Sequence, residues 1–229
     1  MKIVSYNTHK CNQIKIDHIL NMDADLFILP ECSSQDHLIL PEGYNMLWCG
    51  DDDLKEKGLG VIWKKHLSIQ VIPEYKKIKH MLPLLVEGAG VPKFILASWP
   101  TVWKEKKTYP QLLLEALKEY TIYLDKFPSM VVGDYNCYIG QSGVRKSTGT
   151  FEDCIAYMES HGLHSMYHEQ TGETFGKEST ATFYWRFNPS QPFFIDYAFS
   201  SLKPKIFCIG DWEKEMSDHR PLLIELEDA

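Results

Sequence analysis

The sequence predicts one mixed α/β domain. The chain has 229 residues, 44% of them hydrophobic, which is enough for one domain to bury a sizeable core. Short apolar runs of strand length alternate with three segments of helical periodicity. No internal repeat, low-complexity segment or linker divides the chain, so we expect residues 1–229 to form a single domain.

Composition restricts the environment and the partners. A formal net charge of −7 does not require the basic face that proteins holding long duplexes usually have. No apolar run is long enough to span a bilayer, and the first residues enter a strand-like run without the apolar core of a signal peptide. The six cysteines form no Cys-x-x-Cys pair. We therefore expect a reduced, cytoplasmic protein with no membrane association and no obligate protein partner.

The N-terminal half is predicted to contain strands and one helix. The apolar run Ile3–Tyr6 ends at Asn7, and residues at helical spacing predict a helix over Ile14–Met22. A second buried strand, Asp25–Leu29, is followed closely by Glu31. Further short runs, punctuated by prolines, predict strands over Tyr44–Trp48, Leu59–Trp63, Ser68–Ile72, Leu84–Val86 and Lys93–Ser98.

The C-terminal half is predicted to add two amphipathic helices to a strand-rich segment. One apolar face predicts a helix over Tyr109–Tyr123, which leads into the strand Met130–Val132. The other helix covers Thr150–Ser160, with Thr150 as its N-cap, and ends at Gly162. The remaining strands are predicted over Ala181–Trp185, Phe193–Phe199, Lys205–Ile209 and Leu222–Leu226.

Polar side chains begin or end five of these strands. After Met130–Val132, the residues Asp134 and Asn136 lie two apart on an extended chain and therefore project to the same side. An Asx-rich turn would give the same local pattern without any chemistry, but apolar core strands rarely repeat it. The complete set is Asn7, Glu31, Asp134, Asn136, Asp196, Asp218 and His219.

These side chains suit metal-dependent hydrolysis of a phosphoester. Oxygen ligands favour a hard cation, Mg²⁺ or Mn²⁺, over zinc. Such a cation would polarise a phosphoryl oxygen and stabilise the leaving oxyanion. A carboxylate could take the proton of the attacking water, and a protonated histidine could stabilise the charge on the phosphate.

The same residues resemble the endonuclease/exonuclease/phosphatase superfamily, which has the DNase I-like fold. The resemblance covers nearly the whole chain and implies an α/β (α+β) four-layer sandwich, with two mixed β-sheets packed face to face and helices outside. Its five motifs, in the family's order, are Tyr6-Asn7, Leu29-Pro30-Glu31, Gly133-Asp134-Tyr135-Asn136, Ile195-Asp196-Tyr197 and Ser217-Asp218-His219-Arg220-Pro221.

The resemblance implies a metal centre in this chain. Glu31 would be the principal metal ligand, with Asn7 beside it. Asp218 would be a second ligand of the metal or of a water. Mg²⁺ is the expected ion, and Mn²⁺ is the alternative.

The resemblance also implies catalytic roles. Asp134 would orient or deprotonate the nucleophilic water, and Asn136 would contact the phosphate. His219 would hold the scissile phosphate and would be aligned by the carboxylate of Asp196.

One position departs from the family pattern. Many relatives carry a His or a Tyr just after the strand that precedes the long helix, and that group helps to protonate the leaving oxygen. Trp99 stands there in this chain, and its indole has no dissociable proton near neutral pH. Tyr109, His80 or a metal-bound water could replace it. Alternatively, Trp99 lines a pocket for a base or another flat group.

Two further side chains are candidate substrate contacts. His168 lies in a segment that resembles a bacterial subgroup of the superfamily. Arg186 suits a phosphate clamp, although a surface ion pair explains it equally well. A zinc cluster of His161, His164 and His168 is disfavoured because Gly162 interrupts the helix, so we expect these histidines in loops.

Three functions are compatible with this pattern. The leading hypothesis is a divalent-metal-dependent phosphodiester hydrolase, a nuclease that cleaves DNA or RNA by water attack on phosphorus. The alternative is a phosphatase or phosphodiesterase of a small phosphorylated molecule, such as an inositol phosphate or a phospholipid headgroup, because a shared fold does not select the substrate. A binding module with a decayed site is disfavoured, since the candidate residues are chemically intact.

Overall fold

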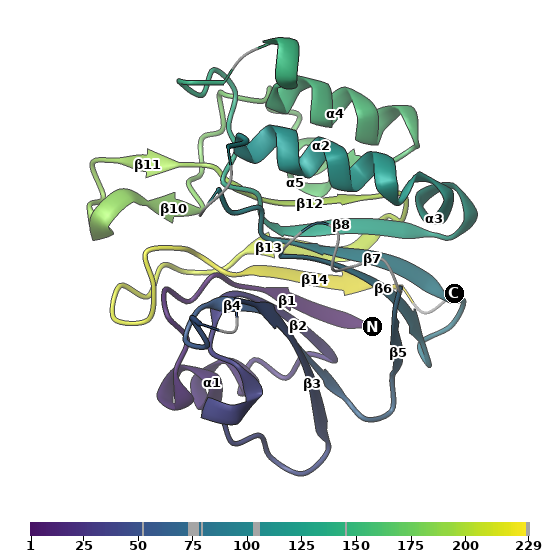
Figure 1. The fold of residues 1–229 in the computed structure, drawn as a ribbon, viewed down its shortest axis with the longest axis vertical. Helices are drawn as coiled ribbons and strands as arrows, with labels where there is room; N and C mark the ends of the chain where they lie inside the picture. The colour runs from purple at the N-terminus through teal and green to yellow at the C-terminus, as the bar shows by residue number, and fades with distance from the viewer. Residues whose placement is uncertain (52, 73–77, 79, 103–105, 145, 228–229) are drawn as a thin grey trace.

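The chain folds into four layers, in which two β-sheets pack face to face and helices cover both outer sides (Figure 1). This computed structural model describes residues 1–51, 53–72, 78, 80–102, 106–144 and 146–227. The predicted architecture of two mixed sheets between helices is therefore confirmed. Met1 and Leu226 are neighbours, since the Met1 amino group donates to the Leu226 carbonyl at 3.0 Å.

The first sheet combines the N-terminal strands with the last two strands of the chain. Its strands are β1 (Lys2–Ser5), β2 (Leu26–Cys32), β3 (Tyr44–Gly50), β4 (Gly58–Lys64), β13 (Pro204–Ile209) and β14 (Leu222–Leu226). Their order is β13-β14-β1-β2-β4-β3, and only β1 and β2 run parallel. Helix α1 (Gln13–Leu20), capped by the Asn12 side chain, covers the outer face. A short 3₁₀ turn, η1 (Gln35–His37), follows β2.

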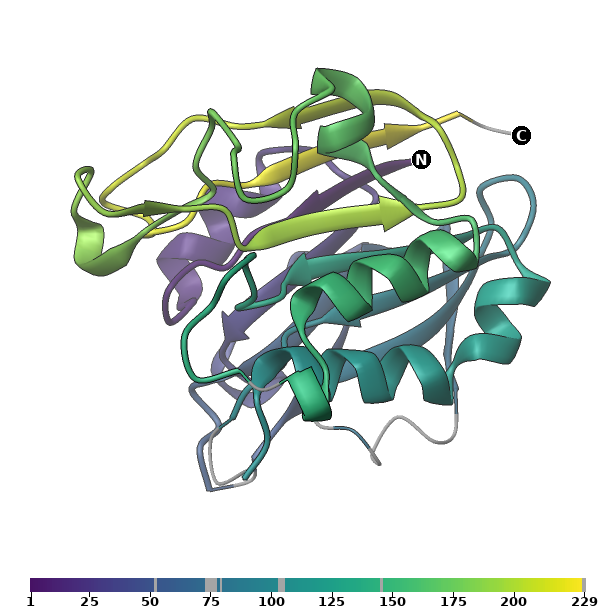
Figure 2. The same cartoon turned by 90° about the horizontal axis from the view of Figure 1, so that it is seen from above.

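The second sheet is built from the middle of the chain. Its strands are β5 (Ser68–Val71), β6 (Met81–Glu87), β7 (Lys93–Ser98), β8 (Ser129–Asp134), β9 (His164–Ser165) and β12 (Asp196–Ser200). Their order is β5-β6-β7-β8-β12-β9, with β7 and β8 parallel. The helices of the outer layer are α2 (Tyr109–Glu119), α3 (Thr121–Lys126), α4 (Phe151–Ser160) and α5 (Met166–Thr171). Figure 2 shows α2 and α4 lying side by side across this face.

A small hairpin extends from one end of the sandwich (Figure 1). It consists of β10 (Phe183–Tyr184) and β11 (Pro192–Phe193), joined through the 3₁₀ turn η4 (Trp185–Phe187). Another 3₁₀ turn, η3 (Lys146–Thr148), precedes α4.

Strand β2 contributes to two separate parts of the core. Leu26 and Ile28 pack between the two sheets, whereas Phe27 and Leu29 pack against α1 on the other side. Side chains of a strand alternate between its faces, so a continuous apolar run is what a strand buried on both faces requires.

Two predicted elements are divided in the structure. The helix expected over Tyr109–Tyr123 breaks at Tyr120, whose backbone is not helical, and α3 restarts at Thr121. The strand expected over Phe193–Phe199 is interrupted between Phe193 and Asp196, because Pro192–Phe193 pairs with β10 instead of a main sheet. For the same reason the strand predicted over Ala181–Trp185 is reduced to Phe183–Tyr184.

Among the helices that the structure describes, none combines the length and the apolar surface needed to cross a membrane.

Candidate active site

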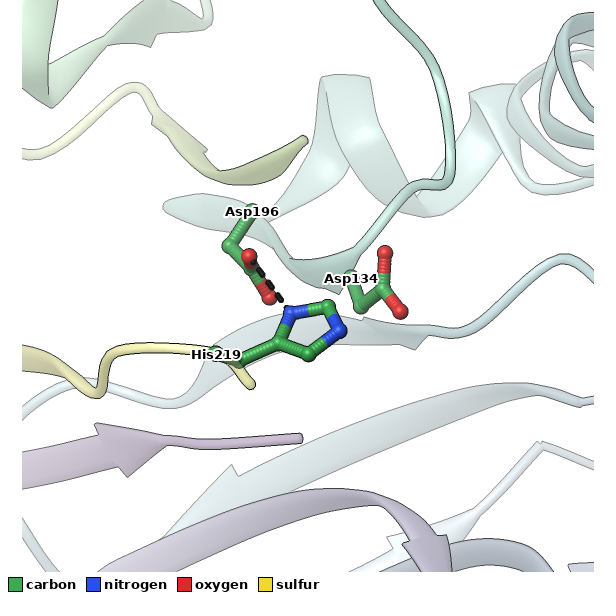
Figure 3. A group of neighbouring side chains, drawn as sticks. All are labelled: Asp134, Asp196 and His219. Atoms are coloured by element: carbon green, nitrogen blue, oxygen red, sulfur yellow. Dashed lines mark hydrogen bonds and ion pairs between the residues drawn. The ribbon is translucent and has the colours of Figure 1, made fainter. Parts of the chain in front are cut away.

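Two buried carboxylates meet at the ends of β8 and β12. Asp134 is the last residue of β8, Asp196 is the first residue of β12, and the antiparallel register sets them directly opposite each other. His219, on the segment before β14, contacts Asp196 through Nδ1, 2.9 Å from Oδ2 (Figure 3). Ligand atoms of the three side chains lie within 4.8 Å of one another.

A glycine brings β8 close enough to β7 for this arrangement. Gly133 has a φ of +148°, and a Cβ there would lie 1.9 Å from the carbonyl oxygen of Ser98. Only glycine fits such a close backbone approach. Asn136 then adopts a left-handed φ of +52° and donates its backbone N–H to Asp134 Oδ1 at 2.8 Å. Its side-chain nitrogen donates to the Pro100 carbonyl at 3.3 Å.

Asn7 holds the other carboxylate oxygen of Asp134. It follows the end of β1, and its Nδ2 donates to Asp134 Oδ2 at 2.9 Å. The Asn7 Oδ1 accepts the backbone N–H of His9 at 3.0 Å. Asp134 therefore accepts a hydrogen bond at each oxygen, which fixes the orientation of its carboxylate.

Thr182 and Ser217 position this cluster, although neither is one of the site residues predicted from the sequence. The buried Thr182 hydroxyl accepts the backbone N–H groups of Ile195 at 3.0 Å and Asp196 at 3.1 Å. Ser217 donates to the Asn7 carbonyl at 2.6 Å and accepts the N–H of His219 at 3.0 Å. Ser217 could have been found from its place in the Ser-Asp-His motif.

Burial and mutual charge set the protonation states of the cluster. Burial raises the pKa of Asp134 to about 7, and the charge of Asp196 acts in the same direction. Burial alone would lower the pKa of His219, but the charge and hydrogen bond of Asp196 outweigh it and raise that pKa to about 9. Near neutral pH an imidazolium therefore lies beside a carboxylate that can exchange a proton.

Glu31 lies in a bulge of β2. Pro30 pairs with Leu59 and Cys32 pairs with Gly58, so Glu31 is the extra residue, with a left-handed φ of +59°. A bulge of this kind redirects a side chain at the end of a strand. Because β1 and β2 are parallel neighbours, Glu31 and Asn7 emerge at the same edge of the sheet.

Trp48 anchors the bulge from β3. Its indole N–H donates to the Cys32 carbonyl, directly after Glu31, at 2.8 Å. The ring lies against Gly50 and Gly58, where an added Cβ would come within 2.2 Å and 2.4 Å of ring atoms. These two glycines make room for the indole, and none of the three residues belongs to the motifs identified in the sequence.

Two acidic side chains at this edge retain oxygens suited to a cation. Glu31 Oε2 is buried and has no hydrogen bond of good geometry among the described residues, although Lys57 Nζ lies 3.1 Å away as an ion-pair partner. Asp218 is buried, and its Oδ1 has no hydrogen-bond partner among the described residues, with His9 Nδ1 3.5 Å away.

Two clefts meet beside the cluster, because Asn136 and Tyr109 line both. The first, of about 490 Å³, contains Glu31 and Lys57, and the second, of about 690 Å³, has aromatic walls. The other described side chains of the first are Asp51, Leu54, His80, Trp99, Thr101 and Val102. The aromatic side chains of the second include Tyr138, Phe183, Trp185 and Phe193.

Comparison with known proteins establishes the fold. No family model matches the chain, and no curated protein matches it in sequence. The endonuclease domain of TRAS1, a telomere-specific non-LTR retrotransposon, has a TM-score of 0.70 at 12% identity, over 99% of this chain and 98% of that one. The chain has the DNase I-like fold. The AP endonuclease LMAP from Leishmania major has a TM-score of 0.66 at 11% identity, over 100% of this chain and 88% of that one. A functionally unknown conserved protein from Enterococcus faecalis has a TM-score of 0.66 at 14% identity, over the full length of both chains.

In this DNase I-like fold, Trp99 is the residue that directly follows β7. Its side chain is largely covered, with 3% of the residue exposed, and it packs against His80 at a ring-centroid distance of 4.8 Å. Little ring surface is left for a base to stack on. His80 Nδ1 lies 2.6 Å from Thr101 Oγ1, and Tyr109 lies where the two clefts meet. The pKa of Tyr109 is raised by burial and by the charge of Asp134.

His168 contacts the protein interior instead of either cleft. Its Nδ1 lies 2.7 Å from Ser165 Oγ, its Nε2 lies 3.2 Å from Glu178, and its ring stacks on Phe175. These contacts engage both ring nitrogens, and a substrate contact by His168 stays a prediction. The expectation of loop histidines is wrong for His164, which lies in β9, and for His168, which lies in α5.

Arg186 lies on the exposed tip of the β10–β11 hairpin. Its guanidinium stands over the Trp185 ring at 5.7 Å, and its φ of +53° is left-handed. Trp185 lines the second cleft, so Arg186 lies at the rim of that cleft. Its role as a phosphate clamp stays a prediction.

Proposed function

We propose that this chain is a divalent-metal-dependent phosphodiester hydrolase that acts as a nuclease on DNA or RNA. The observation that supports this most directly is the buried cluster of Asp134, Asp196 and His219, held by Asn7 and bonded to Asn136, which lines two clefts. A shared fold with an endonuclease domain and an AP endonuclease is compatible with it. By itself, a fold does not select a reaction.

The oxygen donors at the edge of the first sheet fit a hard divalent cation. Glu31, Asn7 and Asp218 offer only oxygens as ligands, and Asp218 Oδ1 is buried without a hydrogen bond among the described residues. His219 suits a ligand poorly, because Asp196 holds its Nδ1 and a pKa of about 9 keeps it protonated. We therefore assign Mg²⁺, with Mn²⁺ as the alternative, to these three residues. When bound, the cation would stabilise negative charge on the phosphoryl and leaving oxygens.

Asp134 is the proposed base. The oxygen of the attacking water forms a bond to phosphorus, and its proton passes to the Asp134 carboxylate while the bond from phosphorus to the leaving oxygen breaks. A pKa of about 7 suits this exchange near neutral pH. The two hydrogen bonds from Asn7 and Asn136 keep the carboxylate oriented during the transfer.

His219 and Asn136 are the proposed phosphate contacts. With Nδ1 bonded to Asp196, the imidazolium presents Nε2–H as a charged donor to a non-bridging oxygen. Asn136 has a second side-chain N–H beyond the one bonded to Pro100. The leaving oxygen needs a proton, for which Tyr109 and His80 in the first cleft are candidates.

The second candidate function is hydrolysis of a small phosphoester. A net charge of −7 favours it, because long nucleic acids usually bind to a basic face. For either substrate we propose a cytoplasmic location, which is supported by the absence of disulfides at Cys11, Cys32, Cys137, Cys154 and Cys208.

The test is hydrolysis of a substrate panel with Mg²⁺ and then Mn²⁺. The panel contains single-stranded DNA, duplex DNA, RNA, bis-p-nitrophenyl phosphate and inositol phosphates. Glu31→Gln should lower nucleic-acid cleavage by at least about 100-fold, since removal of a principal ligand costs on the order of 3 kcal/mol or more of transition-state stabilisation. Glu42→Gln, at an exposed glutamate, is the matched control and should cleave as the wild type does.

Two outcomes would contradict this proposal. Cleavage that persists in Glu31→Gln would exclude the assigned metal centre, provided that thermal unfolding shows a folded variant. Phosphate release from inositol phosphates alone would replace the nuclease by the small-phosphoester function.

A further inference from the structure

Lys57 makes two contacts in the first cleft that no proposed catalytic step uses. Its Nζ lies 3.1 Å from Glu31 Oε2 and 5.7 Å from the ring centroid of Trp99. The Lys57 side chain is 38% exposed and that of Glu31 is 16% exposed, so the ion pair borders the open cleft. The inference drawn from it rests on the proposed metal-dependent function.

The backbone of Lys57 is held by a turn, whereas its side chain is partly exposed in the cleft. Its N–H donates to the Leu54 carbonyl at 3.1 Å, which closes a turn. The next residue, Gly58, begins β4 and packs against the Trp48 indole. The ammonium can therefore exchange partners only within the reach of its own four-carbon stem.

Lys57 and a divalent cation compete for the same carboxylate. Glu31 has one negative charge, which the ammonium already neutralises. A doubly charged ion on Glu31 would repel an ammonium a few ångströms away, and this repulsion is strong because the pair is partly shielded from water. Ion binding at Glu31 therefore requires Lys57 to leave.

The displaced ammonium still lies against the wall of the first cleft. The same cleft is lined by Asn136 and Tyr109, and the Asn136 N–H donates to Asp134. An anion of the substrate would be the strongest available partner, and a flexible ammonium is a suitable phosphate ligand. The scissile phosphate already has His219 and Asn136 as proposed contacts, so the anion for Lys57 is a neighbouring one.

We propose that Lys57 exchanges Glu31 for a second phosphate of the substrate when the metal binds. Lys57 is then a specificity-determining residue, which favours substrates that carry another phosphate beside the scissile one. Nucleic acids and inositol polyphosphates share this chemistry, whereas bis-p-nitrophenyl phosphate has a single phosphate.

The test begins with Mg²⁺ binding to the substrate-free protein, measured by calorimetry. Lys57→Met keeps the stem over Trp99 but removes the charge, so it should bind Mg²⁺ about tenfold more tightly than the wild type. Lys57→Arg keeps the positive charge, so its Mg²⁺ affinity should stay near that of the wild type. Lys55→Met is the matched control, because Lys55 pairs with Asp36 on the surface, and it should leave Mg²⁺ affinity unchanged.

Substrate affinity should change in the opposite direction. For an oligonucleotide, Lys57→Met should raise KM about tenfold and lower the dependence of log KM on log salt by about one unit. The rise in KM for bis-p-nitrophenyl phosphate should be several times smaller than the rise in KM for the oligonucleotide. Inositol polyphosphates, tested in the same way, identify which source of the second phosphate the site accepts.

Each failure has a separate meaning. Unchanged or weaker Mg²⁺ binding in Lys57→Met would overturn the exchange at Glu31. An equal rise in KM for the oligonucleotide and for the single-phosphate ester would overturn the second-phosphate contact. Neither result would contradict the proposed hydrolysis, because that proposal is tested separately by comparing cleavage by the wild type and by Glu31→Gln.

Discussion

At the scale of single residues, Asp196 decides what His219 can do. Asp134 and Asp196 stand opposite each other in the sheet, and two buried carboxylates so close would repel. The His219 imidazolium offsets that repulsion, and its own pKa of about 9 results from the contact with Asp196. The ion pair of His219 and Asp196 therefore both stabilises the site and supplies its cationic hydrogen-bond donor.

The unfolding free energy of the metal-free protein should depend on pH because of the extra proton on His219. The pKa of His219 is 6.5 in the unfolded chain and about 9 in the fold, so the folded state holds the extra proton between these values. Its contribution, up to ~3 kcal/mol, is complete below 6.5 and is lost as pH rises through about 9. Urea unfolding across this range measures it. Asp196→Asn removes the main group that raises the pKa and should flatten the slope, whereas an unchanged slope would contradict the assignment.

At the scale of elements, the bulge in β2 decides where Glu31 points. A regular strand would alternate Pro30, Glu31 and Cys32 across the sheet. The extra residue and its left-handed φ break this alternation, and Trp48 fixes the next carbonyl from a neighbouring part of the sheet. The proposed metal site should thus depend on an indole that is not a ligand itself.

Trp48→Phe tests this dependence. Phenylalanine lacks both the indole N–H that donates to Cys32 and the outer ring atoms that lie beside Gly50 and Gly58, so the variant should lose at least about 1 kcal/mol of unfolding free energy. Mg²⁺ affinity, measured by calorimetry, should fall by about tenfold or more, as for other residues that orient metal ligands. Loss of stability with unchanged Mg²⁺ affinity would show that the indole does not position Glu31.

At the scale of the whole molecule, the core between the sheets supports a site made from both of them. Asn7 and Glu31 come from the first sheet, whereas Asp134 and Asp196 come from the second. The hydrogen bond from Asn7 to Asp134 joins the two sheets at the site. Correct packing between the layers is therefore a condition for assembling the proposed chemistry.

Ile28→Ala separates packing from chemistry. Ile28 is fully buried between the sheets. Its side chain has no polar group that could take part in the proposed chemistry. The cavity should cost about 2–5 kcal/mol of unfolding free energy. We expect kcat to stay within about twofold of the wild type at temperatures well below Tm, where the variant is folded. A loss of kcat in the folded variant would show that the site depends on fine adjustment of the layers.

Local patterns in the sequence determined most of the strands and helices and the polar residues at the strand ends, but not β9 or α5. Apolar runs and helical periodicity depend on neighbours along the chain, so they can be recognised without a structure. The four-layer sandwich followed from five short motifs in order, and the structure confirms it. The contact between His219 and Asp196, expected from the same motifs, is present.

Only the tertiary structure decided how these residues meet. The opposition of Asp134 and Asp196, the bulge at Glu31 and the Lys57 ion pair join residues that lie far apart in the chain. The break at Tyr120 and the separate β10–β11 hairpin likewise depend on what each segment packs against. Contacts of this kind leave no periodic trace in the sequence, because the free energy that selects them arises between elements and not within them.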